Sequence, residues 1–241
     1  MDYLVLFLVG LIGYSYSSIA GGYSFLSVPV LLLIGLDPLT ALGTNLPAQI
    51  LPALTSILNY WRHGKLHVRA VLPLAVFFAI GALVGAYFVV SLESVLLRGL
   101  IATLLLAGVV LLFVKDRIDL TFLKKNRFLE ALFLVGVGFY KSVFGASAKT
   151  LTMMVLTVGR GMEAVEASCA ASVLLSFAVW TGSAYFILSG AVSWPHYLAL
   201  TSGGIIGALL GTELAVKKGG AFVEKVLVLV ALVGAAKVLF F

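Results

Sequence analysis

Charged residues and cysteines are scarce in this chain. Asp, Glu, Lys and Arg make up 11% of its 241 residues, against about 25% in soluble domains, so they are too few to cover a water-facing surface. The single cysteine, Cys169, excludes a disulfide scaffold. Hydrophobic residues reach 62% and the mean hydropathy is +1.16, which excludes intrinsic disorder. An integral membrane protein remains, and the lipid bilayer is its first expected partner.

Signatures of enzymes and of nucleic-acid-binding proteins are missing as well. The chain has no nucleophile elbow, phosphate-binding loop or paired-carboxylate motif, so we expect no catalytic residues and no cofactor. His63 and His67 are four residues apart but have no third ligand beside them, so no metal site is expected. The net charge of +6 comes from Lys and Arg residues that mark cytoplasmic loops, and no nucleic-acid partner is expected.

Long apolar stretches fill the chain instead. They cover residues 3–20, 22–36, 38–60, 70–91, 93–114, 128–145, 147–159, 163–189, 195–216 and 221–241. None alternates with the period of two that barrel strands require, so all are predicted to be helices. A perpendicular membrane helix needs about 20 residues. The second and seventh stretches are shorter than that, which predicts tilted, broken or re-entrant segments.

Basic residues lie in alternate connections, which predicts the orientation. They are Arg62, Lys65, Arg69, Lys115, Arg117, Lys124, Lys125, Arg127, Arg160, Lys217, Lys218 and Lys225. The connections around Asp37, 91–94 and 189–195 contain neither Lys nor Arg. Cytoplasmic loops are enriched in Lys and Arg. We therefore expect a multi-pass plasma-membrane protein with its basic loops in the cytoplasm and both termini outside.

The two halves of the chain resemble each other at an offset of 126 residues. Gly10, Gly35, Gly64, Gly81 and Gly85 fall on Gly136, Gly161, Gly190, Gly207 and Gly211. We predict a first membrane repeat at 1–114, a cytoplasmic linker at 115–127 and a second repeat at 128–241. Each half has five segments, or three crossings if the short segments re-enter. Both numbers are odd, so the repeats should be inverted relative to each other, as in secondary transporters.

Polar residues beside helix breaks give a candidate binding site in the first half. Proline and glycine weaken helices, and freed backbone groups are tolerated in a membrane only where protein or a wet cavity satisfies them. The candidates for binding a substrate are Gly22, Gly43, Thr44, Asn45 and Gln49. The alternative is that these small and polar residues only join helices to each other.

The second half contributes the charged candidates. Lys141 and Lys149 lie in an otherwise apolar block, where a charge is costly and marks a functional hypothesis. The alternative is that they extend to the membrane interface. Ser168 and Ser172 either line the same cavity or bond helices. Should the lysines face the cavity, the cargo would be a small anion, and a helix N-terminus at the break would add positive potential.

These residues resemble the sulfite exporter TauE/SafE family of membrane proteins. The resemblance covers essentially the whole chain and rests on Gly21-Gly22, Val28-Pro29, Gly35-Leu36-Asp37-Pro38, Ala41-Leu42-Gly43-Thr44-Asn45-Leu46, Tyr60, Arg62, Gly64, Arg69 and Gly81…Gly85-Ala86. The second half departs from the family pattern, because Gly145-Ala146-Ser147-Ala148-Lys149 stands where a second glycine-rich run is common.

The resemblance implies export of a small sulfur-containing anion, sulfite or an organosulfonate, by alternating access. A membrane potential that is negative inside assists export by about 2.3 kcal/mol per negative charge and 100 mV. A small-anion channel, or a carrier for another anion such as a carboxylate, remains open as an alternative. A homo-oligomer is compatible with either reading.

Overall fold

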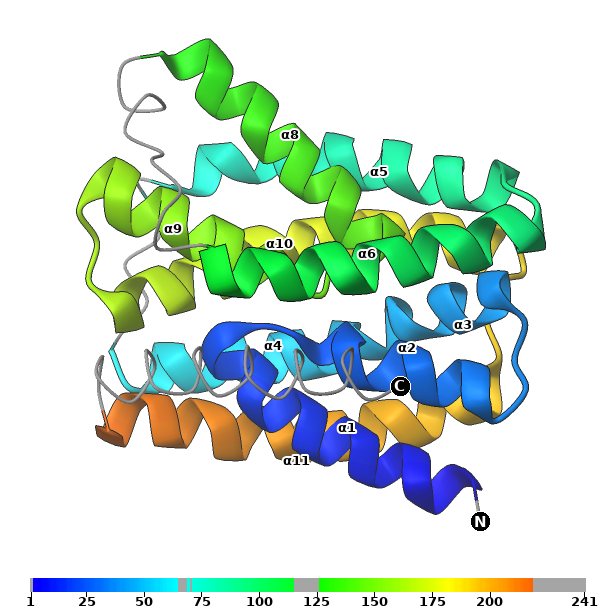
Figure 1. The fold of residues 1–241 in the computed structure, drawn as a ribbon. Helices are drawn as coiled ribbons and strands as arrows, with labels where there is room; N and C mark the ends of the chain where they lie inside the picture. Colours follow the sequence, from blue (N-terminus) through cyan, green and yellow to red (C-terminus); the bar gives the residue numbers. More distant parts are fainter. Residues whose placement is uncertain (1, 65–68, 70, 115–125, 219–241) are drawn as a thin grey trace.

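The structure, a computed structural model, describes residues 2–64, 69, 71–114 and 126–218, and every regular element in them is helical (Figure 1). The helices are α1 (Asp2–Ala20), α2 (Tyr23–Leu33), α3 (Pro38–Asn45), α4 (Ile50–Arg62), α5 (Ala75–Ser91), α6 (Ser94–Val114), α8 (Arg127–Val143), α9 (Ala148–Arg160), α10 (Ala164–Leu188) and α11 (Trp194–Lys218), with short 3-10 helices at Pro47–Gln49 and Leu72–Leu74. The expected all-α membrane fold is confirmed. The predicted tenth segment, 221–241, lies outside the described residues.

Helix length separates spanning helices from short ones. Within the described ranges, four stretches are long and apolar enough to cross a membrane: Asp2–Ile19, Leu72–Ser91, Ala164–Leu188 and Trp194–Lys218. The second and seventh predicted segments form α2 and α9, of 11 and 13 residues. At 1.5 Å per residue they reach about 16 and 20 Å, less than the ~30 Å hydrocarbon thickness. Neither helix can cross the bilayer alone.

The third predicted segment, 38–60, is interrupted in the structure. Asp37 caps α3, α3 ends at Asn45, and a 3-10 turn over Pro47–Gln49 leads into α4. Pro47 has no N–H and so cannot donate the hydrogen bond that would continue α3. The single stretch expected from the sequence is therefore two helices with a break between them.

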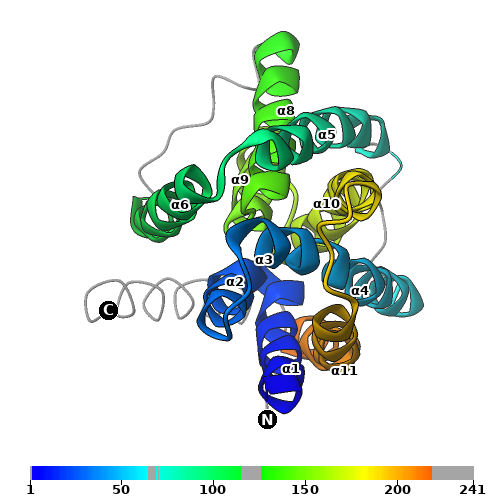
Figure 2. The same cartoon turned by 90° about the vertical axis from the view of Figure 1, so that its right-hand side faces the viewer.

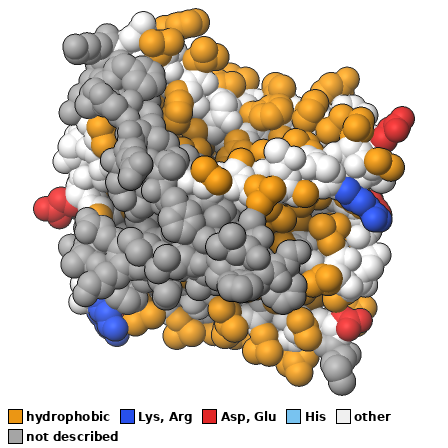
Figure 3. Space-filling view, viewed as in Figure 1, with side chains coloured by type: hydrophobic (Ala, Val, Ile, Leu, Met, Phe, Trp, Pro, Cys, Tyr) orange, Lys and Arg blue, Asp and Glu red, His pale blue; other side chains and the backbone are white. Residues whose placement is uncertain are grey.

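The basic helix ends gather at one end of the molecule (Figure 1). Arg62, Arg160 and Lys217 lie in the last turns of α4, α9 and α11, which all finish at the left of that view. The connections between α2 and α3, α5 and α6, and α10 and α11 lie at the opposite end. Charged side chains visible in Figure 3 lie at these two edges, with hydrophobic side chains between them. This distribution suits a slab of lipid around the middle.

The helix bounds follow the offset of 126 seen in the sequence. Adding 126 to 38–62, the range from α3 to α4, gives 164–188, which is α10. Gly35 and Gly161 both have positive φ, and so do Gly64 and Gly190. In space, α1 packs on α11 and α8 packs on α5, so the first helix of each predicted repeat lies against a helix of the other (Figure 2).

Glycines allow these helix pairs to approach closely. A Cβ atom on Gly203, Gly207 or Gly211 of α11 would collide with backbone carbonyl oxygens of α1, and one on Gly81 or Gly85 of α5 with those of α8. Lipid tails are as apolar as the helices, so association relies on close packing of small residues. Two of the glycine pairs aligned by the offset of 126, Gly81 with Gly207 and Gly85 with Gly211, serve this packing.

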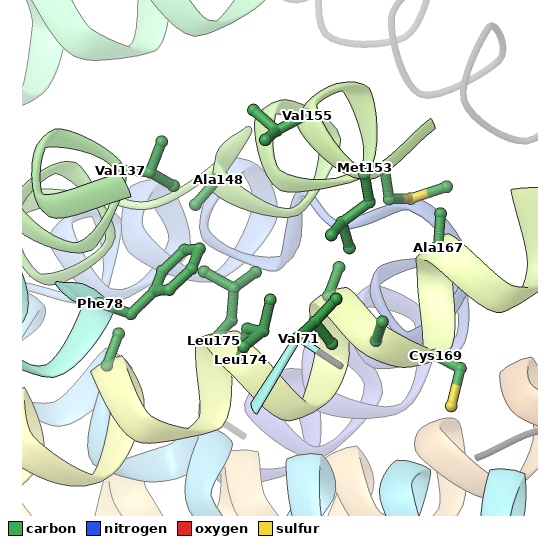
Figure 4. Packing of buried hydrophobic residues seen from close by; sticks show 14 of the residues in the cluster. Val71, Phe78, Val137, Ala148, Met153, Val155, Ala167, Cys169, Leu174 and Leu175 are labelled. Atoms are coloured by element: carbon green, nitrogen blue, oxygen red, sulfur yellow. The ribbon is translucent and has the colours of Figure 1, made fainter. Parts of the chain in front are cut away.

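The centre of the bundle is α10, which contacts α4, α5, α8 and α9. Its Leu174 and Leu175 lie near Phe78 of α5 and Val71, in a cluster of buried side chains (Figure 4). Two large side chains in this cluster, Leu174 and Phe78, have no exposed surface. This packing fixes the rotation of α10 and so decides which of its serines face inward.

Candidate functional site

The first break in the helices lies between α1 and α2. Gly21 and Gly22 have φ of +89° and +101°, a backbone conformation that glycine adopts without steric cost. The Tyr16 hydroxyl donates to the Gly22 carbonyl oxygen at 2.7 Å and so holds the break in place. The chain leaves α1 and begins α2 inside the molecule.

A second break lies between α8 and α9. The helix ends at Val143, Gly145 has φ of +68°, and α9 begins at Ala148. A Cβ atom on Gly145 would collide with the side chain of Lys141. The missing side chain leaves room for the lysine stem beneath the break.

The two breaks meet at one pocket. Gly21 lies against the Lys149 side chain, and both line a cavity of about 40 Å³. A water molecule needs about 10–15 Å³ of such space, so the cavity holds a few waters or one anion of comparable size. Its lining residues are Tyr14, Ser17, Ser18, Gly21, Gly22, Tyr23, Gln49, Ala53, Ser56, Lys141, Gly145, Lys149, Ser172, Leu175, Ser176 and Val179.

Two helices begin at this pocket. Tyr23 is the first residue of α2 and Lys149 the second of α9, and neither helix has a side chain that caps its N-terminus. The first N–H groups of a helix have no partner within the helix and carry a partial positive charge. Helix N-termini of this kind bind anions.

Lys141 reaches the pocket from the last turn of α8. It is buried, and its ammonium donates to Gln49 Oε1 at 2.7 Å. Gln49 is held in turn, because its amide donates to the Asn45 carbonyl oxygen at 3.1 Å. Lysine and glutamine, 92 positions apart, therefore join the two halves of the chain at the cavity.

Lys149 faces the end of α1. Its ammonium donates to the carbonyl oxygens of Ser17 and Ser18 and, at 2.9 Å, to the Ser172 hydroxyl. Among the residues that the structure describes, no Asp or Glu belongs to the pocket lining. Two ammonium groups and two helix N-termini without an acidic residue make a site that favours negative charge.

Two hydroxyls at the pocket have no partner in the described part of the chain. The Tyr23 and Ser56 hydroxyl oxygens are buried and form no hydrogen bond there, although both residues line the cavity. A buried hydroxyl without a partner is costly. Neither residue was proposed from the sequence, because tyrosine and serine occur on many faces of these helices and only the packing shows which face is inward.

The residues proposed from the sequence divide into two groups. Gly22, Gln49, Lys141, Lys149 and Ser172 line the pocket. The other four do not. They are Gly43, Thr44, Asn45 and Ser168.

Each of these four has neighbours elsewhere in the protein. Gly43 lies against the Ala191 carbonyl oxygen, and the Thr44 hydroxyl accepts from the Ser193 N–H at 2.9 Å. The Asn45 amide bonds to the hydroxyls of Ser24 and Ser27 of α2. The Ser168 hydroxyl donates to the Ile19 carbonyl oxygen at 2.6 Å. They join α3 and α10 to neighbouring segments.

The fold and the pocket define a helical membrane protein with a polar site between two interrupted helices, the arrangement found in secondary transporters. The sequence model of the family described as Sulfite exporter TauE/SafE matches residues 6–238. The chain belongs to this family and is a membrane transporter.

Curated relatives cover nearly the whole chain. A "Probable membrane transporter protein ORF9" of Sinorhizobium is 29% identical over 238 residues, covering 97% of this chain and 91% of the relative. A "Probable membrane transporter protein" of Haemophilus influenzae is 27% identical, covering 98% and 94%. The "Probable membrane transporter protein YfcA" of Escherichia coli is also 27% identical, covering 98% and 89%. No solved structure matches the chain.

Proposed function

We propose that this transporter exports a small sulfur-containing oxyanion, of which sulfite is the best fit, across the plasma membrane. The observation that carries the proposal is a pocket lined by Lys141 and Lys149, with no acidic side chain among its described lining residues. The volume of about 40 Å³ suits a compact inorganic anion. An organosulfonate has the same head group but needs additional room for its carbon chain.

The packing of the predicted repeats supports alternating access as the mechanism. The pocket lies where the break between α1 and α2 meets the break between α8 and α9, one from each predicted repeat. Rocking of one inverted repeat against the other would open such a site to each side in turn. We propose that residues 1–114 and 128–241 are these repeats and that the basic helix ends face the cytoplasm.

Binding to the purified protein tests the proposal directly. Thermal unfolding in detergent is measured with sulfite, sulfate, a carboxylate and an organosulfonate, each over a concentration series. An anion at 100 times its dissociation constant stabilises the folded protein by about 2.7 kcal/mol. We expect sulfite to raise the melting temperature at the lowest concentration. If none of the anions stabilises the protein, the proposed cargo is wrong.

Flux through proteoliposomes separates a carrier from a channel. Sulfite efflux should saturate with concentration and rise steeply with temperature, because each cycle of alternating access requires a conformational change. Efflux that stays linear in concentration and depends weakly on temperature would favour the channel.

A further inference from the structure

We propose that the two pocket lysines have different roles: Lys141 binds the anion, together with the Tyr23 and Ser56 hydroxyls, whereas Lys149 is a positioning residue that caps the interrupted helix α1. This assignment rests on the proposed function, since it names which groups of that pocket contact the cargo. It starts from the hydrogen bonds that each ammonium already makes.

Lys149 has its donors occupied. A lysine ammonium has three N–H donors, and that of Lys149 has three acceptors: the carbonyl oxygens of Ser17 and Ser18 and the Ser172 hydroxyl. An anion could reach this ammonium only by displacing one of these acceptors. Its charge contributes to the potential of the pocket, but its direct contacts are with the protein.

The acceptors of Lys149 belong to the C-terminal end of α1. The last carbonyl groups of a helix have no partner within it and attract cations. Here the Ser18 carbonyl oxygen also accepts from the Tyr60 hydroxyl at 3.1 Å, and the Ile19 carbonyl oxygen accepts from Ser168. Lys149, Tyr60 and Ser168 thus form one set of caps that lets α1 end inside the molecule.

Lys141 has donors to spare. Among the described residues its ammonium has one hydrogen-bond acceptor, Gln49 Oε1 at 2.7 Å. The other two N–H groups have no acceptor there, although the side chain is buried and lines the cavity. A buried ammonium with one neutral partner is unfavourable, and an anion in the cavity would supply the missing charge and acceptors.

Two hydroxyls without a partner belong to residues that line the same pocket. Tyr23 and Ser56 each have a buried hydroxyl without a hydrogen bond in the described part of the chain, and both line the cavity with Lys141. An oxyanion accepts hydrogen bonds and donates few. Three donors from α2, α4 and α8 suit the three oxygen atoms of a pyramidal oxyanion such as sulfite.

The experiment measures two quantities for each variant in detergent: the melting temperature without ligand and the dissociation constant for sulfite. For Lys141→Gln we expect sulfite affinity to fall about 10- to 150-fold, because a hydrogen bond to a charged group is lost. The unliganded melting temperature should stay the same or rise. Tyr23→Phe should weaken sulfite binding by roughly 2- to 10-fold, as for a neutral hydrogen bond.

Lys149→Gln should show the reverse pattern. Its unliganded melting temperature should fall by roughly 3–10 °C as the α1 carbonyls lose a charged donor, and sulfite affinity should fall less than in Lys141→Gln. Tyr60→Phe is the matched control, because it removes another cap of the Ser18 carbonyl from outside the pocket lining. It should lower the melting temperature and leave sulfite binding intact.

A second variant keeps the assignment testable if Lys141→Gln does not fold. Gln49→Glu preserves the size of the lysine's partner but gives it a carboxylate, which pairs with Lys141 and repels an anion. Sulfite binding should be lost, whereas the melting temperature should change little, because the new ion pair with Lys141 offsets the hydrogen bond that the carboxylate can no longer donate to the Asn45 carbonyl oxygen. Wild-type affinity in Gln49→Glu or Lys141→Gln would overturn the assignment, as would a loss in Lys149→Gln equal to that in Lys141→Gln.

If the proposed function itself is wrong, the measurements differ from those that refute only the roles assigned to the two lysines. In that case the wild-type protein binds no sulfite or other tested anion, so the role of Lys141 fails with it. The capping role of Lys149 is still decided by the unliganded melting temperatures. A wild-type protein that binds sulfite, combined with insensitive Lys141 and Gln49 variants, refutes the assignment alone.

Discussion

Gly21 packs directly on the side chain of Lys149, so closely that a Cβ atom on the glycine would collide with the Cβ of the lysine. The contact joins the break after α1 to the first turn of α9, 128 positions later in the chain. Gly21 also has φ of +89°. The backbone and the space around it both require glycine at this position.

Gly21→Ala should therefore destabilise the protein. A non-glycine residue at such a φ costs about 1–3 kcal/mol, and overpacking against Lys149 adds to this cost. Gly35→Ala is the matched control, because Gly35 has a similar φ of +94° but no atom within 4 Å of the added Cβ. Thermal unfolding in detergent should show a larger loss for Gly21→Ala. Equal losses would mean that the contact with Lys149 contributes nothing.

The cap of α3 predicts a dependence on pH. Partial burial raises the pKa of Asp37, but hydrogen bonds from the Thr40 side chain and from the N–H groups of Thr40 and Leu39 outweigh it and leave the pKa below its ordinary value. The folded state therefore binds this proton less tightly than the unfolded state. The resulting stability is present above the ordinary Asp pKa of about 3.9 and is lost as the pH falls through the lower folded value.

Asp37→Asn tests this dependence, since asparagine is an equally good N-cap without a titrating group. Melting temperatures of the two proteins should be similar at neutral pH. Below about pH 4 the wild-type protein should lose more than the variant. Parallel curves over the whole range would show that the Asp37 carboxylate does not contribute.

Much of the architecture could be predicted from local signals along the chain. The adjacent glycines at 21 and 22 weaken a helix and indicate a possible break, and the apolar stretches that form α2 and α9 are too short to cross a membrane whatever their neighbours. The lysines stood out because charge is costly in lipid. These features depend on a few adjacent residues, so they could be predicted without knowing the packing.

The rest of the pocket depends on helix rotation. Tyr23 and Ser56 look like any tyrosine and serine in an apolar helix, and only contacts far along the chain turn them inward. Asn45 is the reverse case, a residue that the sequence pointed to but that does not line the pocket. Its polarity beside a break was visible, but its partners, Ser24 and Ser27 on α2, follow from the way α3 folds back on α2.

The gathering of basic helix ends predicts how the molecule is oriented in the membrane. Arg62 in the last turn of α4 should be cytoplasmic and Glu93, between α5 and α6, external. Single cysteines at these exposed positions can be labelled in a Cys169→Ser background, which removes the buried native thiol. A membrane-impermeant maleimide should label Glu93→Cys in intact cells and Arg62→Cys only after permeabilisation. The opposite pattern would reverse the orientation.

Asn45 allows the two readings of the first-half polar residues to be separated. The sequence analysis predicts that the Asn45 amide contacts the cargo. In the structure, however, Asn45 Oδ1 accepts from the Ser27 hydroxyl at 2.5 Å and Asn45 Nδ2 donates to the Ser24 hydroxyl at 3.0 Å. Asn45→Ala removes the partner of the buried Ser24 hydroxyl and leaves Ser27 only its bond to the Tyr23 carbonyl oxygen, at a cost of about 1–3 kcal/mol. We expect the melting temperature and the folded yield to fall, with sulfite flux per folded molecule retained.

Asn59→Ala is the matched control for this prediction. Asn59 is also buried, and its amide donates to the Thr212 hydroxyl at 2.6 Å, between α4 and α11 and outside the pocket lining. Both variants should lose stability while each folded molecule transports normally, because both amides join helices. If Asn45→Ala abolishes flux per folded molecule and Asn59→Ala does not, the amide acts on the cargo, and the pocket must extend to α3 in another state of the transport cycle.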